Sequence, residues 1–319
     1  MTSPIKKVNA QFSPQHMFVI LCKRCNLSCV YCAQSSHPGA TGQLDVSVLS
    51  AWLRNAEMGA LTSVDFSGGE PLLADGFSEL LEDVLERTSL EVTIASNLYS
   101  VKCLDESLLK ENAHRLHWRI ALEGVSAESH DAIRGKGSFA ALLSGLDYLR
   151  KNEIVSLSCI TVIRPGLLRF LPSMVELLGS HGFKRHNWVG LLPFGRGSNH
   201  RHWGLEPSLW FDHLRPLARD LSLAYDIEIA LYGPILRPEE ASSVSTDLLD
   251  DNRFLALTVF PDGSVYCNCF IQAFITRRPI DRIYRADFAE LRSRANQEFQ
   301  NRTCERCRFQ FACFGIKPL

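Results

Sequence analysis

The sequence predicts an α/β protein: an open, partial (β/α)6 TIM-like barrel followed by a small C-terminal domain with a β-hairpin and a helix. Short apolar runs alternate with segments of helical periodicity over the first part of the chain, as in parallel strands joined by crossover helices. Polar or glycine-rich residues follow these runs. Only six such units occur, which is too few to close an eight-unit barrel.

The strands of the barrel are expected at six short, largely apolar runs, which cover residues 16–21, 63–67, 91–95, 116–122, 155–163 and 186–192. Helices are expected between them, where apolar side chains recur on one helical face, at residues 45–58, 77–85, 105–112, 138–151 and 170–180. Asp45 can cap the first helix and Gly59 can end it. Cys22 is expected at the end of the first strand, and Cys103 and Cys159 as inert core residues.

The alternation fails after about residue 222, and the acidic, serine-rich stretch 239–251 is typical of a loop or linker. A β-hairpin and a final helix are expected beyond it, over residues 255–260, 264–269 and 285–300. The sequence therefore predicts a barrel domain at residues 1–225 and a smaller second domain at residues 226–319.

Composition narrows the class of protein. The chain has 319 residues and a formal net charge of −1, so no bulk basic field favours nucleic acid or an anionic membrane as a partner. No apolar run approaches the ~20 residues that cross a bilayer, and the first ten residues contain no apolar signal core. A cytoplasmic location is expected. Because the cytosol keeps thiols reduced, clustered members of the 11 cysteines indicate metal binding or catalysis rather than disulfides.

Cys25, Cys29 and Cys32 form the strongest motif, with three thiols at C-x3-C-x2-C spacing directly after the first strand. A cubane of four irons normally takes four thiolates, so a loop that offers three predicts a [4Fe–4S] cluster with one iron left open to a small molecule. A zinc knuckle is the alternative, but zinc sites prefer C-x2-C pairs closed by a second pair.

This stretch, including Tyr31 before the third cysteine, resembles the signature of the radical S-adenosylmethionine (radical SAM) enzymes. In that family the open iron chelates the amino and carboxylate groups of SAM. An electron from the cluster then cleaves SAM reductively, and the resulting 5′-deoxyadenosyl radical abstracts hydrogen from the substrate. The resemblance also implies the partial barrel and a small electron-donor protein such as flavodoxin or ferredoxin.

The motifs at the other strand ends resemble the family's SAM-binding segments. Gly68-Gly69-Glu70 resembles the segment that contacts the SAM amine, since glycines let backbone approach a ligand and a carboxylate can receive an ammonium. Ser96 and Asn97 suit ribose hydroxyls, although a strand-end Asx turn is the alternative. Val162 is expected to cover adenine.

Two further runs resemble the subfamily whose C-terminal domains bind auxiliary clusters. In the run 130–139, the Arg134 guanidinium is expected to bind the SAM carboxylate bidentately. Glu123 is expected at the cofactor, although Glu123 and Ala121 depart from the usual Asp and Ser. Residues 193–197 resemble the "P.GRG" turn, and the basic, aromatic stretch 200–203 after it is either a substrate contact or a solvated loop.

The C-terminal cysteines resemble a Twitch or truncated SPASM domain. No further cysteine follows Cys313, so ligands remain for one auxiliary [4Fe–4S] cluster: Cys304, Cys307, Cys313 and one of Cys267 or Cys269. A four-cysteine zinc site is the alternative. The cysteine of the hairpin pair that is not a ligand is a candidate catalytic hydrogen-atom donor, and the sequence does not distinguish Cys267 from Cys269.

The resemblance implies a radical SAM oxidoreductase or epimerase with SAM and two [4Fe–4S] clusters. The expected substrate is a small natural-product intermediate of the sugar, aminocyclitol or nucleoside type, because no peptide-binding domain is expected before the first strand. The alternative is a peptide-maturing enzyme that cross-links or epimerises a ribosomal precursor. A non-catalytic metal–cysteine scaffold or redox sensor is the third hypothesis.

Overall fold

The computed structural model describes residues 15–58, 61–232, 256–267, 279, 281–283, 290 and 294. Within them, one sheet contains β1 (His16–Cys22), β2 (Ser63–Gly68), β3 (Glu91–Ser96), β4 (Leu116–Ala121), β5 (Leu157–Val162), β6 (Arg185–Val189), β7 (Glu228–Tyr232), β8 (Ala256–Val259), β9 (Ser264–Cys267) and β10 (Asp281–Arg282). The helices are α1 (Val46–Met58), α2 (Phe77–Arg87), α3 (Glu106–Glu111), α4 (Ala127–Arg134), α5 (Ser138–Lys151), α6 (Leu171–Ser180) and α7 (Arg215–Tyr225).

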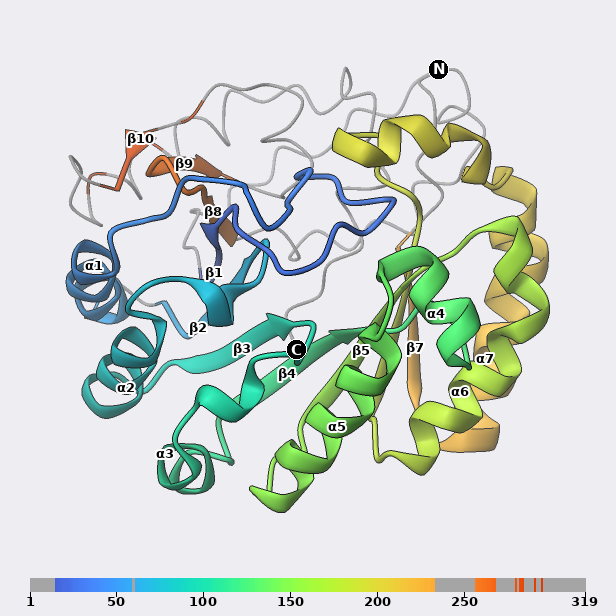
Figure 1. The fold of residues 1–319 in the computed structure, drawn as a ribbon, viewed down its shortest axis with the longest axis horizontal. Coiled ribbons are helices and arrows are strands. Elements are labelled where there is room, and N and C mark those ends of the chain that lie inside the picture. The colour runs from blue at the N-terminus through green and yellow to red at the C-terminus, as the bar shows by residue number, and fades with distance from the viewer. Residues whose placement is uncertain are drawn as a thin grey trace, which may run out of the picture.

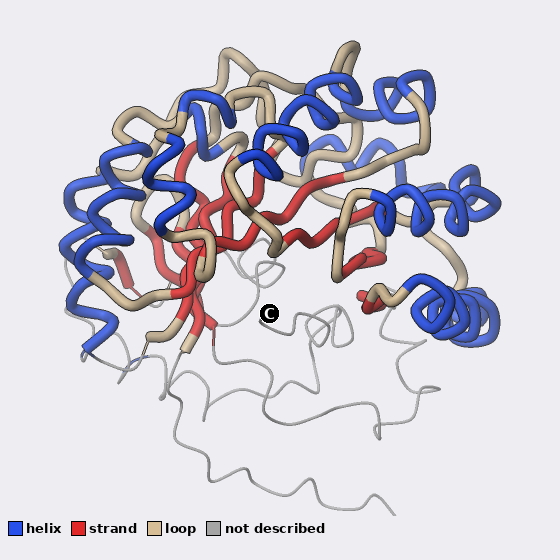
Figure 2. The backbone as a smooth tube through the Cα atoms, turned by 90° about the horizontal axis from the view of Figure 1, so that it is seen from below, coloured by secondary structure: helices blue, strands red, loops and turns tan. Residues whose placement is uncertain are grey.

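The strands follow the order β10-β9-β8-β1-β2-β3-β4-β5-β6-β7, and every pair from β8 through β7 is parallel. The order has two free ends, so the sheet is open within the described residues. Figures 1 and 2 show the helices along the outer side of this curved sheet. The predicted α/β fold, an open sheet of parallel strands, is confirmed. No helix in the described ranges is long and apolar enough to cross a membrane.

The sheet is wider than the sequence indicated at both ends. The seventh parallel strand, β7, pairs with β6 although it lies beyond residue 225, where a second domain was expected to begin. Its residues are only half-buried or exposed, although its sequence, EIALY, is largely apolar. At the other end, the predicted hairpin β8–β9 is present, and β8 pairs in parallel with β1. The described part of the hairpin therefore extends the barrel sheet.

Helix positions agree with the periodicity except for two that were not predicted, α4 and α7. Asp45 caps α1 as expected, because its carboxylate accepts the backbone N–H groups of Ser47 and Val48 at 2.9 and 3.3 Å. The expected stop at Gly59 lies outside the described residues. The α4 segment is short and mostly polar, so it presents little apolar periodicity.

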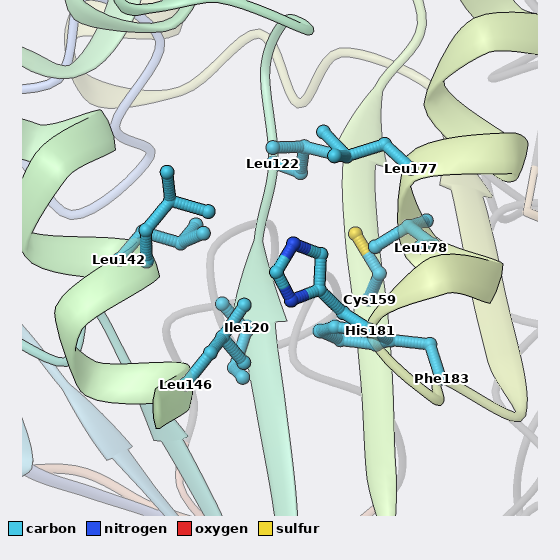
Figure 3. A pocket seen from close by; sticks show the side chains of 10 residues that line it. Ile120, Leu122, Leu142, Leu146, Cys159, Leu177, Leu178, His181 and Phe183 are labelled. Carbon is cyan, nitrogen blue, oxygen red and sulfur yellow. The ribbon is translucent and has the colours of Figure 1, made fainter. Parts of the chain in front are cut away.

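The outer face of the sheet, which packs against the helices, is apolar. Figure 3 shows Cys159 of β5 against leucines of α5 and α6, where it lines an apolar cavity of about 10 Å³. This volume is at the lower limit for one water molecule, so the cavity is a packing gap rather than a ligand site. Trp118 pairs with Leu157, two residues before Cys159, and therefore shares its outer face. Phe66 lies on the same face in register with Trp118, and both side chains are fully buried.

Three cysteines outside the clusters were expected to be buried or to end a strand. Cys22 lies at the end of β1 and is buried, as predicted. Cys159 is also buried, in the core between the sheet and the helices. The prediction for Cys103 is wrong, because its side chain is exposed. It ends a short 3₁₀ segment that turns Val101 inward and leaves Cys103 at the surface.

The inner face of the sheet carries a buried ion pair. Asp65 of β2 lies 2.6 Å from the Arg119 guanidinium of β4 and 3.5 Å from the His16 imidazole of β1, and only 1% of Asp65 is exposed. Burial opposes ionisation of this carboxyl, but Arg119 and His16 outweigh it and hold the pKa of Asp65 well below its usual range. Asp65, Arg119 and His16 therefore join three strands on the concave side of the sheet.

We expect Asp65→Asn to lower the free energy of unfolding by about 3 kcal/mol at pH 7, because Arg119 loses its buried counter-charge. Since the folded pKa of Asp65 is depressed, the wild-type contribution is present above pH ~4 and declines as the pH falls below that. Urea unfolding at pH 7 and at a pH of about 2.5 measures both. The control Asp147→Asn removes an exposed pair with Arg150 and should cost under about 1 kcal/mol; equal losses would contradict the assignment.

Candidate functional site

The cysteine loop leaves the carboxyl end of β1 and folds back over the edge of the sheet. The backbone N–H of Cys25 donates to the carbonyl of His37 at 3.2 Å, and the N–H of Val30 donates to the carbonyl of Ile133 at 3.0 Å. The loop is therefore tied both to its own return segment and to α4, the helix that carries Arg134. Parallel barrels hold their working residues at this edge.

The three predicted thiols lie together there as free cysteines. Cys25 is 6% exposed, and burial raises the pKa of its thiol to about 12. Burial also raises the pKa of Cys29, while the Arg134 guanidinium opposes that rise. Charge on Cys29 disfavours ionisation of Cys25, and charge on Cys32 disfavours ionisation of Cys29, so the three sulfurs share one electrostatic environment.

Three neighbouring thiols are the ligand set that a [4Fe–4S] cubane with one open iron requires. In the part of the chain that the structure describes, no three His, Cys, Asp or Glu side chains converge enough to hold one metal ion. In a cubane each thiolate binds a different iron, so its ligands stand further apart than those of one ion.

Gly68 and Gly69 pack directly beneath the start of the cysteine loop. The N–H of Gly69 donates to the carbonyl of Cys22 at 2.7 Å, and the N–H of Glu70 donates to that of Arg24 at 2.9 Å. A Cβ at Gly69 would lie 2.2 Å from the Arg24 carbonyl oxygen, and one at Gly68, whose φ is +152°, would lie 2.6 Å from the Cys22 oxygen. No side chain fits at either position, so these glycines permit the loop to approach β2.

The Glu70 carboxylate was expected to receive an ammonium group, but it is buried and bound to the end of β3. It accepts the Ser96 hydroxyl and the Asn97 N–H at 2.8 Å each, and the Leu72 N–H at 3.3 Å. Burial raises the pKa of Glu70 to about 7, although these donors oppose the rise. Its side chain therefore couples two strand ends. The Glu70 N–H and carbonyl are bonded to Arg24 and Leu73, which leaves the carbonyls of the two glycines to face a ligand.

Ser96 and Asn97, the predicted ribose contacts, also make local bonds. The Asn97 side-chain oxygen accepts the Tyr99 N–H at 3.1 Å, which is the Asx turn that the sequence offered as the alternative. The Asn97 amide donates to Asn26 Oδ1 at 2.8 Å and lies 3.8 Å from Cys25 Sγ. Asn97 thus connects the end of β3 to the cysteine loop.

Arg134 lies beside the second cysteine at the end of α4. Its guanidinium donates to the Tyr31 hydroxyl at 3.1 Å, and the backbone carbonyl of Arg134 is 3.9 Å from Cys29 Sγ. Glu123 lies close enough to Tyr31 for each to shift the pKa of the other. Burial opposes the charge on Arg134, but Tyr31, Cys29 and Glu123 outweigh it and raise the pKa of Arg134. The Arg134 guanidinium is therefore held as a cation against the cysteine loop.

Glu123 faces a second guanidinium that the sequence analysis missed. Arg164 lies 2.6 Å from the Glu123 carboxylate and also donates to its backbone carbonyl at 2.7 Å. The other carboxylate oxygen accepts the backbone N–H of Val162 at 3.2 Å. Arg164 follows β5 by two residues, so the rule that working residues follow strand ends was the signal that could have found it.

The remainder of the run 130–139 builds the support for Arg134. Asp131 accepts the N–H groups of Gly137 and Phe139 at 2.6 and 2.8 Å and so caps α5. His130 is fully buried, and its Nδ1 accepts the N–H of Glu123 at 3.2 Å. Burial lowers the pKa of His130 to about 3, so the imidazole is neutral. These residues position α4, and Arg134 with it.

The C-terminal ligands cannot be placed. The side chain of Cys267 and the whole of Cys269, Cys304, Cys307 and Cys313 lie outside the described residues. The auxiliary cluster therefore stays a prediction, as does the role of a hairpin cysteine as a hydrogen-atom donor.

The profile of the Radical SAM superfamily matches residues 19–168, which contain the three cysteines, the Gly68–Glu70 turn and Arg134. Residues 19–168 form a radical SAM domain. This stretch runs from within β1 to the segment after β5, so the domain contains most of the predicted cofactor site.

Three curated relatives share part of this sequence. The subtilosin biosynthesis protein AlbA of Bacillus subtilis is 29% identical over 196 residues (59% of this chain, 42% of AlbA). Mycofactocin maturase MftC of Mycobacterium tuberculosis is 28% identical over 232 residues (71% and 56%). A probable GTP 3′,8-cyclase of Methanocella arvoryzae is 28% identical over 190 residues (54% and 61%). The chain spans about half the length of these relatives.

Among solved structures, the radical SAM domain and its surroundings resemble Streptococcus suis SuiB. SuiB bound to S-adenosylmethionine superimposes with a TM-score of 0.72 at 13% identity, over 97% of this chain and 74% of SuiB. A second SuiB structure, bound to the precursor peptide SuiA, gives a TM-score of 0.70 at 12% identity, over 95% and 71%. At this identity the likeness shows a shared fold.

We expect Glu70→Gln to lower the free energy of unfolding by about 1–3 kcal/mol, because one end of the amide is a donor where Glu70 now accepts three bonds. Thermal unfolding of the metal-free protein measures the loss. Glu86 on α2 is exposed, so Glu86→Gln is the matched control and should have little effect. A wild-type unfolding curve for Glu70→Gln would mean that its carboxylate does not couple the two strand ends.

Proposed function

We propose that the chain is a radical SAM enzyme that modifies a peptide, such as a ribosomal precursor. The observation that carries the radical SAM assignment is the juxtaposition of Cys25, Cys29 and Cys32 with Arg134 at one edge of a parallel sheet. The three thiols would hold a [4Fe–4S] cluster with one iron free of protein ligands. When bound, the cluster and SAM supply a radical that abstracts hydrogen.

The residues around the thiols have separate tasks in this proposal. Arg134 receives the SAM carboxylate, since a guanidinium matches a carboxylate bidentately. Tyr31 orients Arg134 through the 3.1 Å bond, and Glu123 balances the two buried guanidinium charges. In our proposal the backbone carbonyls of Gly68 and Gly69 receive the SAM amine.

Ser96, Asn97 and Val162 complete the pocket for the nucleoside. Val162 is 8% exposed at the end of β5, so it can cover an adenine ring with its apolar side chain. The network from Glu70 through Ser96 and Asn97 to Asn26 fixes the rim on which the ribose would lie. In our proposal these residues shape the site and exclude water from it. They do not exchange protons with the substrate.

The relatives favour a peptide over the small natural product that the sequence analysis preferred. The names of AlbA and MftC describe a bacteriocin biosynthesis protein and a mycofactocin maturase, and SuiB was solved with a precursor peptide. The reaction on the peptide would be an oxidation, a cross-link or an epimerisation. A nucleotide substrate is the second candidate, because the chain also matches a probable GTP 3′,8-cyclase.

The remaining parts of the proposal concern electron supply. Cys304, Cys307 and Cys313, with Cys267 or Cys269, would hold an auxiliary [4Fe–4S] cluster, following the sequence resemblance. A small donor such as flavodoxin or ferredoxin would reduce the SAM-binding cluster. Cluster thiolates must stay reduced, so a reducing compartment such as the cytoplasm suits the protein.

Anaerobic reconstitution tests the cluster assignment. Two cubanes predict about eight irons per chain with matching sulfide, and Cys29→Ala should remove about four of them. The wild-type protein should release 5′-deoxyadenosine on reduction with SAM, and Cys29→Ala should not. Cys103→Ala, at an exposed and isolated thiol, is the control. Zinc without iron would instead support a non-catalytic scaffold.

Arg134→Gln should weaken SAM binding by about 10- to 100-fold, because it removes a charge-assisted, bidentate contact. Isothermal titration of SAM into the reconstituted protein measures this. Arg150, exposed on α5 and paired with Asp147, supplies the control Arg150→Gln. Unchanged SAM affinity in Arg134→Gln would show that another group receives the carboxylate.

The substrate class is tested with precursor peptides encoded near this gene and with GTP, each incubated with SAM and reductant in deuterated water. Faster formation of 5′-deoxyadenosine with a peptide supports the proposal, and faster formation with GTP alone contradicts it. In the modified product, deuterium on carbon indicates epimerisation, whereas a two-hydrogen mass loss indicates oxidation or cross-linking.

A further inference from the structure

The turn at residues 193–197 lies against the cysteine loop, although the two are separated by about half of the chain. The backbone N–H of Arg196 donates to the carbonyl of Cys32 at 3.0 Å. Its side chain donates through Nε to the carbonyl of Cys29 at 2.8 Å and through Nη2 to that of Ser36 at 2.7 Å. One residue therefore binds three carbonyls of the loop, and two of them belong to the predicted ligands themselves.

The glycines on each side of Arg196 make this approach possible. A Cβ on Gly195 would lie 2.4 Å from the Ala33 carbonyl oxygen and 2.6 Å from that of Cys32. The φ of Gly195 is +52°, in the left-handed region that favours glycine. A Cβ on Gly197 would lie 3.0 Å from the Tyr31 oxygen and 2.3 Å from that of Leu192. The turn thus packs backbone to backbone against the segment 31–33.

The Arg196 guanidinium is suited to hold the cysteine loop rigidly. A guanidinium is a planar, always charged fork, so its bonds to two carbonyls fix direction as well as distance. The loop is also tied at its ends, where Lys23 pairs with Gly42 and Leu44 with Leu21, and the N–H of Val30 donates to Ile133 of α4. Arg196 adds a support that joins the second and third cysteines to the return segment.

We propose that Arg196 is a positioning residue that holds Cys29 and Cys32 in place for cluster assembly, so that the loop is shaped before iron arrives. This inference rests on the proposed function, in which these cysteines bind the SAM cluster. It assigns to the turn 193–197 a mechanical role that the sequence resemblance left without one. Arg196 acts through the loop carbonyls and has no contact with substrate in this proposal.

Hydrogen exchange of the metal-free protein tests this role of Arg196 without any cluster. In Arg196→Gln, the amides of Cys32 and of the surrounding residues 29–36 should exchange at least about tenfold faster than in wild type, because charge-assisted bonds are lost. Arg196→Lys should behave like Arg196→Gln, since one ammonium cannot replace the fork. Exchange in β3 and β4 should stay unchanged, which separates loosening of the loop from misfolding.

Reconstitution then tests the consequence for the cluster. The EPR signal of the reduced cluster that changes when SAM is added reports the N-terminal site alone. We expect this signal to fall several-fold in Arg196→Gln and Arg196→Lys. It should also fall in Gly195→Ala, because the added Cβ would push the turn away from the carbonyls of Cys32 and Ala33. Arg201→Gln, at an exposed position in the same segment, is the control and should reconstitute like wild type.

Wild-type exchange rates and a wild-type SAM-dependent signal in Arg196→Gln would overturn the inference and leave the proposed function intact. Full rescue by Arg196→Lys would also overturn it, since charge alone would then suffice. If wild-type protein gives no SAM-dependent signal at all, the proposed function fails, and with it the role in cluster assembly.

Discussion

The contact between the glycine pair and the start of the cysteine loop is the constraint on which the site depends. Because neither Gly68 nor Gly69 has room for a Cβ, the loop lies against the carboxyl end of β2 and cannot be displaced from the sheet without breaking that contact. Glu70 then turns its side chain away to bind the end of β3. The thiols are thereby fixed over three neighbouring strand ends, at the edge where a parallel sheet places its functional groups.

Two buried ion pairs lie on the concave side of the sheet. Asp65 with Arg119, and Glu123 with Arg164, each place a carboxylate on the concave side of the sheet within 2.6 Å of a guanidinium. Such pairs contribute little net stability compared with apolar residues, but losing one partner is costly. At Glu123 the cost has a purpose in our account, because its carboxylate stabilises the charge of Arg134 beside Cys29, while the Tyr31 hydroxyl accepts a bond from the Arg134 guanidinium. The longer Glu in place of the usual Asp reaches both Arg164 and Val162.

The sequence predicted those parts of the site whose signal is local. The six strands, the three cysteines and the Gly68–Glu70 turn follow from spacing and periodicity within short windows. Arg164 and Arg196 were missed as contacts because their partners, Glu123 and Cys29, are 41 and 167 residues away in the chain. β7 was missed although its sequence, EIALY, is largely apolar, because it lies beyond residue 222, where the strand–helix alternation was expected to end. The inward turn of the Glu70 carboxylate likewise depends on a neighbour, Ser96, that only the folded sheet supplies.

The central claim is that one iron of an N-terminal cubane has no protein ligand and binds SAM directly. Electron–nuclear double resonance on the reduced protein, with SAM labelled isotopically at its amino nitrogen and carboxylate, tests this most directly. Our account predicts hyperfine coupling from both labels to the cluster, and its disappearance in Cys29→Ala. Coupling from neither label, with a protein side chain found on the fourth iron instead, would contradict it.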